Sequence, residues 1–187
     1  MIISISGDPG SGKSTVAKII ANRLKLKHYS AGDFRRKMAL ERGMNIHELN
    51  ALGEKEAFTD NDADDYQRKL GITEDNFIID GRLSFYFIPH SYKIYLKVDS
   101  QIAAERIFNA QRLDEHIYAS IDDVLNATKA RVESDEKRYK KYYGIDYTDA
   151  KQYDLVIDTT KSTPEEIADK IISEIRKKVC IRLLTIS

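Results

Sequence analysis

The chain has 187 residues, and its 30 lysines and arginines balance its 30 aspartates and glutamates, so the formal net charge near pH 7 is zero. This balance argues against a basic surface spread over the whole protein, and we expect neither a nucleic-acid polymer nor a membrane as partner. The single cysteine, Cys180, excludes an internal disulfide and a cysteine-rich zinc site. No apolar run approaches the ~18 residues of a membrane span, and the first residues lack the basic and apolar regions of a leader. We therefore expect a cytoplasmic protein, monomeric or homodimeric, with one domain over residues 1–187.

The glycine-rich stretch at residues 7–15 matches the phosphate-binding loop pattern G-x-x-x-x-G-K-[ST] without a mismatch. A β-branched run precedes it and helical apolar spacing follows it, which is the order that this motif requires. Its glycines let backbone N–H groups approach an anion, and the following helix adds its positive end. We expect Lys13 to neutralise the β- and γ-phosphates of ATP and the Ser14 hydroxyl to bind Mg²⁺. The predicted cofactor-binding residues of the loop are Gly7, Asp8, Pro9, Gly10, Ser11, Gly12, Lys13, Ser14 and Thr15.

Strand and helix patterns alternate along the chain. Strands are predicted at residues 2–6, 27–30, 76–82, 92–98 and 153–158, and helices at 16–24, 34–42, 45–52, 60–70, 99–109, 121–143 and 164–179. Gly43, Gly71 and Gly144 are predicted helix stops. This alternation predicts an α/β fold with a five-stranded parallel sheet and helices on both faces, so that ligands bind at the carboxyl ends of the strands. Residues 180–187 receive no role, and a small edge strand and a dimer contact both stay open.

Two candidate residues follow the third predicted strand. Asp80 ends an apolar run, as the acid of a Walker B strand does, and could hold Mg²⁺ or accept a proton from a substrate phosphate. The alternative for Asp80 is a strand-end acid without a ligand. Arg82 suits recognition of a phosphate or a base, and the alternative is a surface arginine.

A second anion-binding arrangement is predicted after the second strand. Ser30 and Gly32 there precede a helix that begins with Arg35 and Arg36. The two arginines point about 100° apart on a helix, so only one of them should face a cleft, and we favour Arg35.

Charged side chains on the long helix 121–143 form the last candidate site. Arg131, Asp135 and Arg138 are spaced i, i+4 and i+7 and share one face, while Arg106 and Arg112 lie on or beyond the preceding helix. One interpretation is a lid whose arginines close over a transferring phosphoryl group, with Asp135 holding both Arg131 and Arg138 at rest. The other is a solvated helix with exposed ion pairs. Tyrosines 139, 142 and 143 are interpreted as packing residues, and the four histidines show no metal-ligand spacing.

Taken together, these motifs resemble the nucleoside monophosphate kinases, and most closely the archaeal-type cytidylate kinases, from residue 1 to about residue 179. The resemblance implies a P-loop kinase fold with a small monophosphate-binding helical region at 34–71 and a short helical lid at 106–146. Asp-x-Arg after the third strand is also similar to thymidylate kinases, so the base preference stays open. The resemblance implies that Ser30, Gly32, Arg35 and Arg82 bind the monophosphate and that Arg106, Arg131 and Arg138 are lid or transition-state residues. Together with the motifs, we expect catalytic roles for Lys13, Asp80, Arg131 and Arg138, metal binding by Ser14 and Asp80, and cofactor binding by Arg106. We also expect Asp33, Asp80 and Gly81 to bind the substrate.

The leading hypothesis is an enzyme that uses MgATP to phosphorylate CMP or dCMP, giving ADP and CDP or dCDP. The alternatives are a kinase for another acceptor (UMP, dTMP, AMP or a small metabolite) and an ATP-dependent switch or assembly factor. Arg131 and Arg138 in the same chain favour a kinase, because switches often take such an arginine from a partner.

Overall fold

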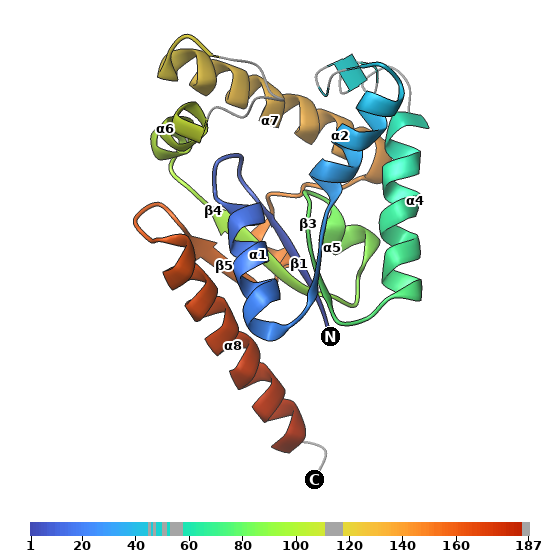
Figure 1. Cartoon of the computed structure of the whole chain (residues 1–187), viewed down its shortest axis with the longest axis vertical. Helices are drawn as coiled ribbons and strands as arrows, with labels where there is room; N and C mark the ends of the chain where they lie inside the picture. Colours follow the sequence, from blue (N-terminus) through green and yellow to red (C-terminus); the bar gives the residue numbers. More distant parts are fainter. Residues whose placement is uncertain (45, 47, 50–51, 53–57, 111–117, 185–187) are drawn as a thin grey trace.

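A five-stranded parallel sheet forms the centre of the computed structural model, which describes all residues except 45, 47, 50–51, 53–57, 111–117 and 185–187 (Figure 1). The strands lie in the order β2-β3-β1-β4-β5, which confirms the predicted α/β fold. Their registers place Ile5 and Ser30 beside Asp80, so the loops after β1, β2 and β3 leave the sheet at one edge. The strands are β1 (Ile2–Gly7), β2 (Lys27–Ser30), β3 (Phe77–Asp80), β4 (Tyr92–Lys97) and β5 (Leu155–Asp158).

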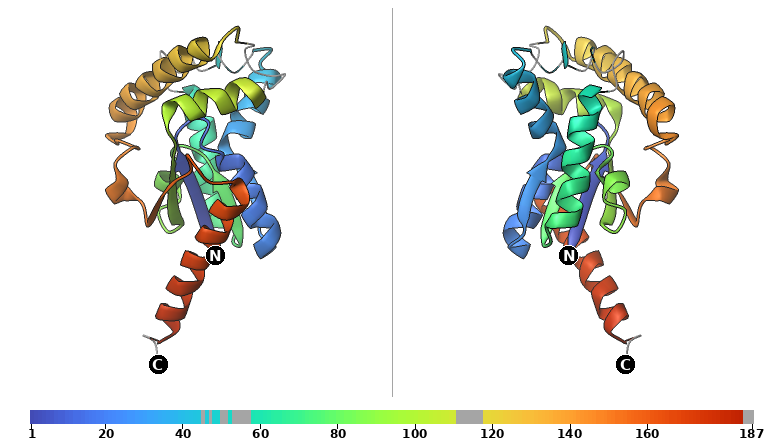
Figure 2. Two further views of the ribbon diagram at one scale, coloured as in Figure 1. Left: turned by 90° about the vertical axis from the view of Figure 1, so that its left-hand side faces the viewer. Right: turned by 90° about the vertical axis from the view of Figure 1, so that its right-hand side faces the viewer.

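Helices cover both faces of the sheet (Figure 2). On one face, α1 (Lys13–Leu24) and α8 (Pro164–Leu184) pack their apolar sides onto alternate strand residues such as Ile3, Ile5 and Ile94. The other face is covered by α4 (Phe58–Thr73) and α5 (Ser84–Phe87), together with the end of α7 (Ile121–Tyr143). Because both faces are buried, the strands are almost continuously apolar, as is usual in parallel sheets.

The remaining helices stand above the carboxyl edge of the sheet. In Figure 1, α7 crosses over this edge, with α6 (Ser100–Ala110) packed against it at one end and α2 (Ala31–Glu41) near the other. A short 3-10 helix, Ala150–Gln152, leads into β5. None of the helices, as far as the chain is described, has the length and apolar character needed to span a bilayer.

Several element boundaries differ from the sequence prediction. Helix α2 begins at Ala31 rather than at residue 34, because the Ser30 hydroxyl accepts a hydrogen bond from the Asp33 amide (3.3 Å) and caps it. Strand β3 ends at Asp80, and neither α5 nor the 3-10 helix was predicted. Residues up to Leu184 continue α8, so an edge strand is the wrong interpretation for residues 181–184. Of the predicted helix 45–52, residues 46, 48, 49 and 52 are helical, and the rest lie outside the described residues.

Two of the three glycines that were predicted to end helices do so. Gly43 and Gly144 both have φ +69° and end their helices as predicted. Gly71 does not end α4, which continues to Thr73. A Cβ at Gly71 would lie 3.0 Å from Cγ2 of the buried Ile88, so glycine serves close packing of α4 against the segment after α5.

Candidate active site

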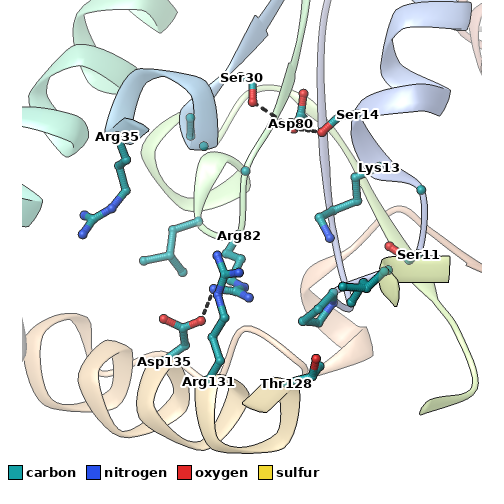
Figure 3. Close-up of a pocket in the computed structure, with 18 of the residues that line it drawn as sticks. Ser11, Lys13, Ser14, Ser30, Arg35, Asp80, Arg82, Thr128, Arg131 and Asp135 are labelled. Atoms are coloured by element: carbon teal, nitrogen blue, oxygen red, sulfur yellow. Dashed lines mark hydrogen bonds and ion pairs between the residues drawn. The ribbon is translucent and has the colours of Figure 1, made fainter. Parts of the chain in front are cut away.

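A cavity of about 840 Å³ opens at the carboxyl edge of the sheet. The P-loop, the loop after β3 and helices α2, α4, α6 and α7 all contribute to its lining. Figure 3 shows that Lys13, Arg35, Arg82 and Arg131 reach into it from four different elements. Such a concentration of positive charge suits a ligand with several phosphate groups.

The P-loop closes tightly around its own lysine. Gly7 has φ +145°, and a Cβ there would lie 2.2 Å from the Leu96 carbonyl oxygen, so only glycine fits this turn. The Lys13 ammonium donates to the carbonyl oxygens of Gly7 (3.0 Å) and Asp8 (2.6 Å). Burial lowers the pKa of Lys13 to about 7, and the positive charge of Arg82 adds to this effect. A phosphate group would restore the positive charge that the bare site disfavours.

Asp8 anchors the loop and does not line the cavity. Its carboxylate accepts hydrogen bonds from the Tyr95 hydroxyl (2.7 Å) and the Val98 amide (3.0 Å), both on or beside β4. Burial raises the pKa of the Tyr95 hydroxyl, and so does its bond to Asp8, so it stays a donor. The structure therefore gives the Asp8 side chain a part in fixing the loop to the sheet, and cofactor binding by Asp8 stays a prediction.

Asp80 receives three polar partners at the end of β3. The hydroxyls of Ser14 (2.8 Å) and Ser30 (3.1 Å) donate to one carboxylate oxygen, and His28 Nε2 lies 2.7 Å from the other. Burial raises the pKa of Asp80, but these hydrogen bonds outweigh it and leave the pKa below its usual value. An ionised Asp80 is a poor proton acceptor at neutral pH. The pair of a hydroxyl and a carboxylate oxygen fits the hard oxygen ligands that Mg²⁺ prefers.

His28 is a residue that the sequence analysis missed, because the histidines were tested only for metal-ligand spacing. The available signal was strand alternation: His28 lies two residues before Ser30 on β2, so both side chains face the same side of the sheet. Within the described part of the chain, no group of three or more His, Cys, Asp or Glu side chains is placed to hold a metal ion.

Asp135 joins two buried arginines from different elements. It forms an ion pair with Arg82, from the loop after β3, and accepts a hydrogen bond from Arg138 Nη2 (2.7 Å). The side chain of Arg82 is only 14% exposed, and those of Asp135 and Arg138 are each 7% exposed. Exposed ion pairs were the alternative interpretation of this helix, and burial makes that interpretation wrong for Asp135 and Arg138. Of the two predicted partners of Asp135, Arg138 is confirmed and Arg131 stays a prediction, and Arg82 is an additional partner that was not predicted.

The other predicted site residues fall into two groups. Gly32, Arg35, Gly81 and Arg131 line the cavity, and so does Arg36, whose guanidinium group pairs with Asp33. The side chain of Arg106 also lines it and donates to the carbonyl oxygens of Thr159 (2.8 Å) and Thr160 (3.2 Å). The residues that do not line it are Gly7, Asp8 and Asp33, and Arg112 lies outside the described residues.

Comparison with solved structures defines the class of the protein. The chain superposes on a shikimate kinase from Bacteroides thetaiotaomicron with a TM-score of 0.66 and 14% identity, covering 94% of this chain and 98% of that one. This likeness and the P-loop geometry together define a P-loop kinase fold.

The family follows from the sequence comparisons. The family model of the cytidylate kinase-like family matches residues 2–161, and the chain belongs to this family. A cytidylate kinase from Methanocella arvoryzae is 39% identical over 180 residues, which cover 95% of this chain and 99% of the relative. An S-adenosylmethionine-dependent nucleotide dehydratase from Lacinutrix mariniflava is 37% identical over 179 residues, but they cover only 36% of that protein. The chain is accordingly an ATP-dependent phosphotransferase of the nucleoside monophosphate kinase type.

Removing Asp135 should destabilise the fold. Asp135→Ala leaves the guanidinium groups of Arg82 and Arg138 buried without their shared carboxylate, which costs about 3–5 kcal/mol of unfolding free energy. Chemical denaturation measures this loss. Glu136→Gln, at the exposed neighbouring position, is the control and should change the unfolding free energy by less than about 0.5 kcal/mol. Equal effects of the two substitutions would contradict the buried ion-pair assignment.

The lowered pKa of Lys13 predicts proton uptake when ATP binds. Its pKa of about 7 leaves Lys13 mostly neutral at about pH 8, and nearby phosphates raise the pKa so that the amine becomes protonated. Calorimetry in buffers of different ionisation enthalpy should therefore show uptake near pH 8 and much less near pH 6, where Lys13 already carries its proton. Lys13→Met should abolish the difference, and Lys18→Met, at an exposed position of α1, should keep it. If Lys13→Met still takes up a proton when ATP binds near pH 8, the proton goes to a group other than Lys13.

Proposed function

We propose that the protein transfers the γ-phosphoryl group of MgATP to CMP or dCMP, giving ADP and CDP or dCDP. The observation that carries this proposal is a single cavity with two sets of anion-binding groups. One set is the P-loop with Lys13, and the other is the pair Arg35 and Arg82 near the end of β3. The names of the curated relatives support cytidine as the nucleoside. Both substrates are cytoplasmic solutes, and the cytoplasm is the proposed location.

Different residues of the cavity are proposed to bind ATP, Mg²⁺ and the nucleoside monophosphate. The P-loop amides and Lys13 would hold the β- and γ-phosphates, with Arg106 beside them. Ser14 and Asp80 would hold Mg²⁺, which neutralises charge on the phosphate oxygens. On the acceptor side, the monophosphate would be held by Arg35 and Arg82, with Ser30, Gly32 and Gly81 lining its site.

The chemical step needs positioning and charge neutralisation. An oxygen of the acceptor phosphate attacks the γ-phosphorus, the bond from the γ-phosphorus to the β,γ-bridging oxygen breaks, and ADP leaves with that electron pair. The acceptor phosphate is largely a dianion at pH 7, so the step requires no general base. This agrees with the low pKa of Asp80, which suits it to a constant negative charge. Arg131 and Arg138 would meet the charge that develops on the transferring group.

Within one domain of residues 1–187, we propose residues 34–71 as the monophosphate-binding region and 106–146 as the lid. The buried ion pair of Asp135 and Arg138 supports a fixed end of the proposed lid helix in its C-terminal half. Arg131 lies on the preceding turns at an exposed position, and its charge already acts on Lys13 by lowering the pKa of that amine. We propose that a movement of this part of α7 closes the site.

Acceptor dependence tests the proposed reaction. We expect ADP release to be fast with CMP and dCMP and slow without an acceptor, in a coupled assay across CMP, dCMP, UMP, AMP, GMP and dTMP. Lys13→Ala should lower turnover at least ~10²-fold, because a partner of the transition-state charge is lost. An ATP turnover that is the same with and without every acceptor would favour a switch or assembly factor instead.

The two lid arginines should differ in their effects. Arg131→Ala and Arg138→Ala should each lower kcat by ~10²-fold or more. Arg131→Ala should keep the melting temperature, since Arg131 is exposed, whereas Arg138→Ala should lower it by breaking a buried ion pair. Lys137→Ala, at an exposed position between them, is the control for both measurements. A normal kcat in Arg131→Ala would end the lid interpretation.

A further inference from the structure

Two buried polar side chains line the cavity without a part in the proposed phosphoryl transfer. Asp64 and Gln67 lie on α4 and are 6% and 4% exposed. Their spacing of three residues places them side by side on one face of the helix. The apolar residues Ile46, Ala63 and Phe87 line the same cavity, as expected around the ring of a nucleobase.

The hydrogen bonds of Gln67 fix which way its amide points. Its Nε2 donates to the carbonyl oxygen of Ala63 (3.2 Å), and its Oε1 accepts from the hydroxyl of the fully buried Ser84 (2.7 Å). A backbone carbonyl can only accept, so the amide nitrogen is the atom that faces it. This nitrogen carries a second hydrogen. Gln67 can therefore donate a hydrogen bond at the cavity wall without changing the orientation of its amide.

Asp64 is an acceptor beside that donor. Its carboxylate accepts a hydrogen bond from the hydroxyl of Tyr143, at the end of α7. A carboxylate has about four lone-pair sites, so Asp64 can accept a hydrogen bond from a ligand in addition to those from its protein partners. The α4 wall therefore presents an acceptor and a donor three residues apart.

We infer that Asp64 and Gln67 recognise the hydrogen-bonding edge of the nucleobase, an inference that rests on the proposed function. Asp64 accepts from an exocyclic amino group, and Gln67 donates to the neighbouring ring nitrogen. Cytosine offers its N4 amino group next to N3, and adenine offers N6 next to N1. Uracil, thymine and guanine carry a carbonyl oxygen in place of the amino group, next to a ring N–H.

The same pair disfavours bases that carry an oxo group. A carbonyl oxygen placed against the Asp64 carboxylate brings two acceptors together in a buried site. The ring N–H would meanwhile face the Gln67 donor, so that neither group is satisfied. A buried site built for hydrogen bonds rejects the mismatched ligand strongly for this reason. The pair thus selects bases with an amino group over bases with an oxo group. Selection between the one-ring cytosine and the two-ring adenine would depend on the shape of the cavity.

Base preference in matched variants tests the inference. The wild-type protein should phosphorylate CMP with a kcat/KM at least ~10-fold above that for UMP. Asp64→Asn should lower this CMP-to-UMP ratio ~10-fold or more, because an amide can donate to the uracil oxygen. Asp65→Asn is the control, because Asp65 is the next residue but is 78% exposed and pairs with Arg68; its ratio should stay at the wild-type value. Gln67→Met removes the donor and should lower the kcat/KM for CMP while sparing the KM for ATP.

The outcomes separate base recognition from a structural role and from the proposed function. If Asp64→Asn lowers the melting temperature but leaves the ratio unchanged, Asp64 only anchors Tyr143 and the inference is overturned. Tyr143→Phe keeps the carboxylate, so its ratio should stay at the wild-type value, and a ratio that falls as in Asp64→Asn overturns the inference too. A wild-type preference for UMP or dTMP overturns the inference while monophosphate kinase activity stands. If no nucleoside monophosphate stimulates ADP release, the proposed function itself is wrong.

Discussion

The convergence of four cationic side chains on one cavity is the constraint on which the site depends. Lys13 begins α1, Arg82 lies in the loop after β3, and Arg131 and Arg138 lie on α7, and all four line the cavity. Burial lowers the pKa of Lys13, and the positive charges of Arg82 and Arg131 lower it further. Two carboxylates offset the remaining charge. Asp80 does so beside the P-loop, and Asp135 does so between Arg82 and Arg138.

These carboxylates also determine which parts of the molecule are fixed. Asp80 ties β2, β3 and the start of α1 together through His28, Ser30 and Ser14. Asp135 ties the C-terminal half of α7 to the loop after β3. Asp8 adds a third link, from the P-loop to β4. These side-chain hydrogen bonds and ion pairs thus preorganise the P-loop and the loop after β3, while the cationic side chains line the cavity.

The proposed phosphate binding and the inferred base recognition use different chemistry in neighbouring parts of the cavity. The arginines and Lys13 supply charge, which attracts any phosphate and distinguishes poorly between nucleotides. Asp64 and Gln67 supply directed hydrogen bonds on an apolar wall, which is the means by which a site distinguishes bases. Tyr143 links the two parts, since it bonds to Asp64 from the same helix that carries Asp135 and Arg138.

Local sequence patterns by themselves determined most of the secondary structure of this protein and its phosphate-binding loop. The P-loop, the five strands and the helix ends at Gly43 and Gly144 all depend on residues within a few positions of one another. Parallel strand order then brought Ser14 and Asp80 to one edge, as the motif implied. Only the tertiary structure decided the partners across the fold. His28 and Asp80 are 52 residues apart, Arg82 and Asp135 are 53 apart, and Asp64 and Tyr143 are 79 apart. No periodicity encodes which helix faces meet, so pairing Asp135 with Arg82, or packing Gly71 against Ile88, became visible only when the helices were placed on the sheet.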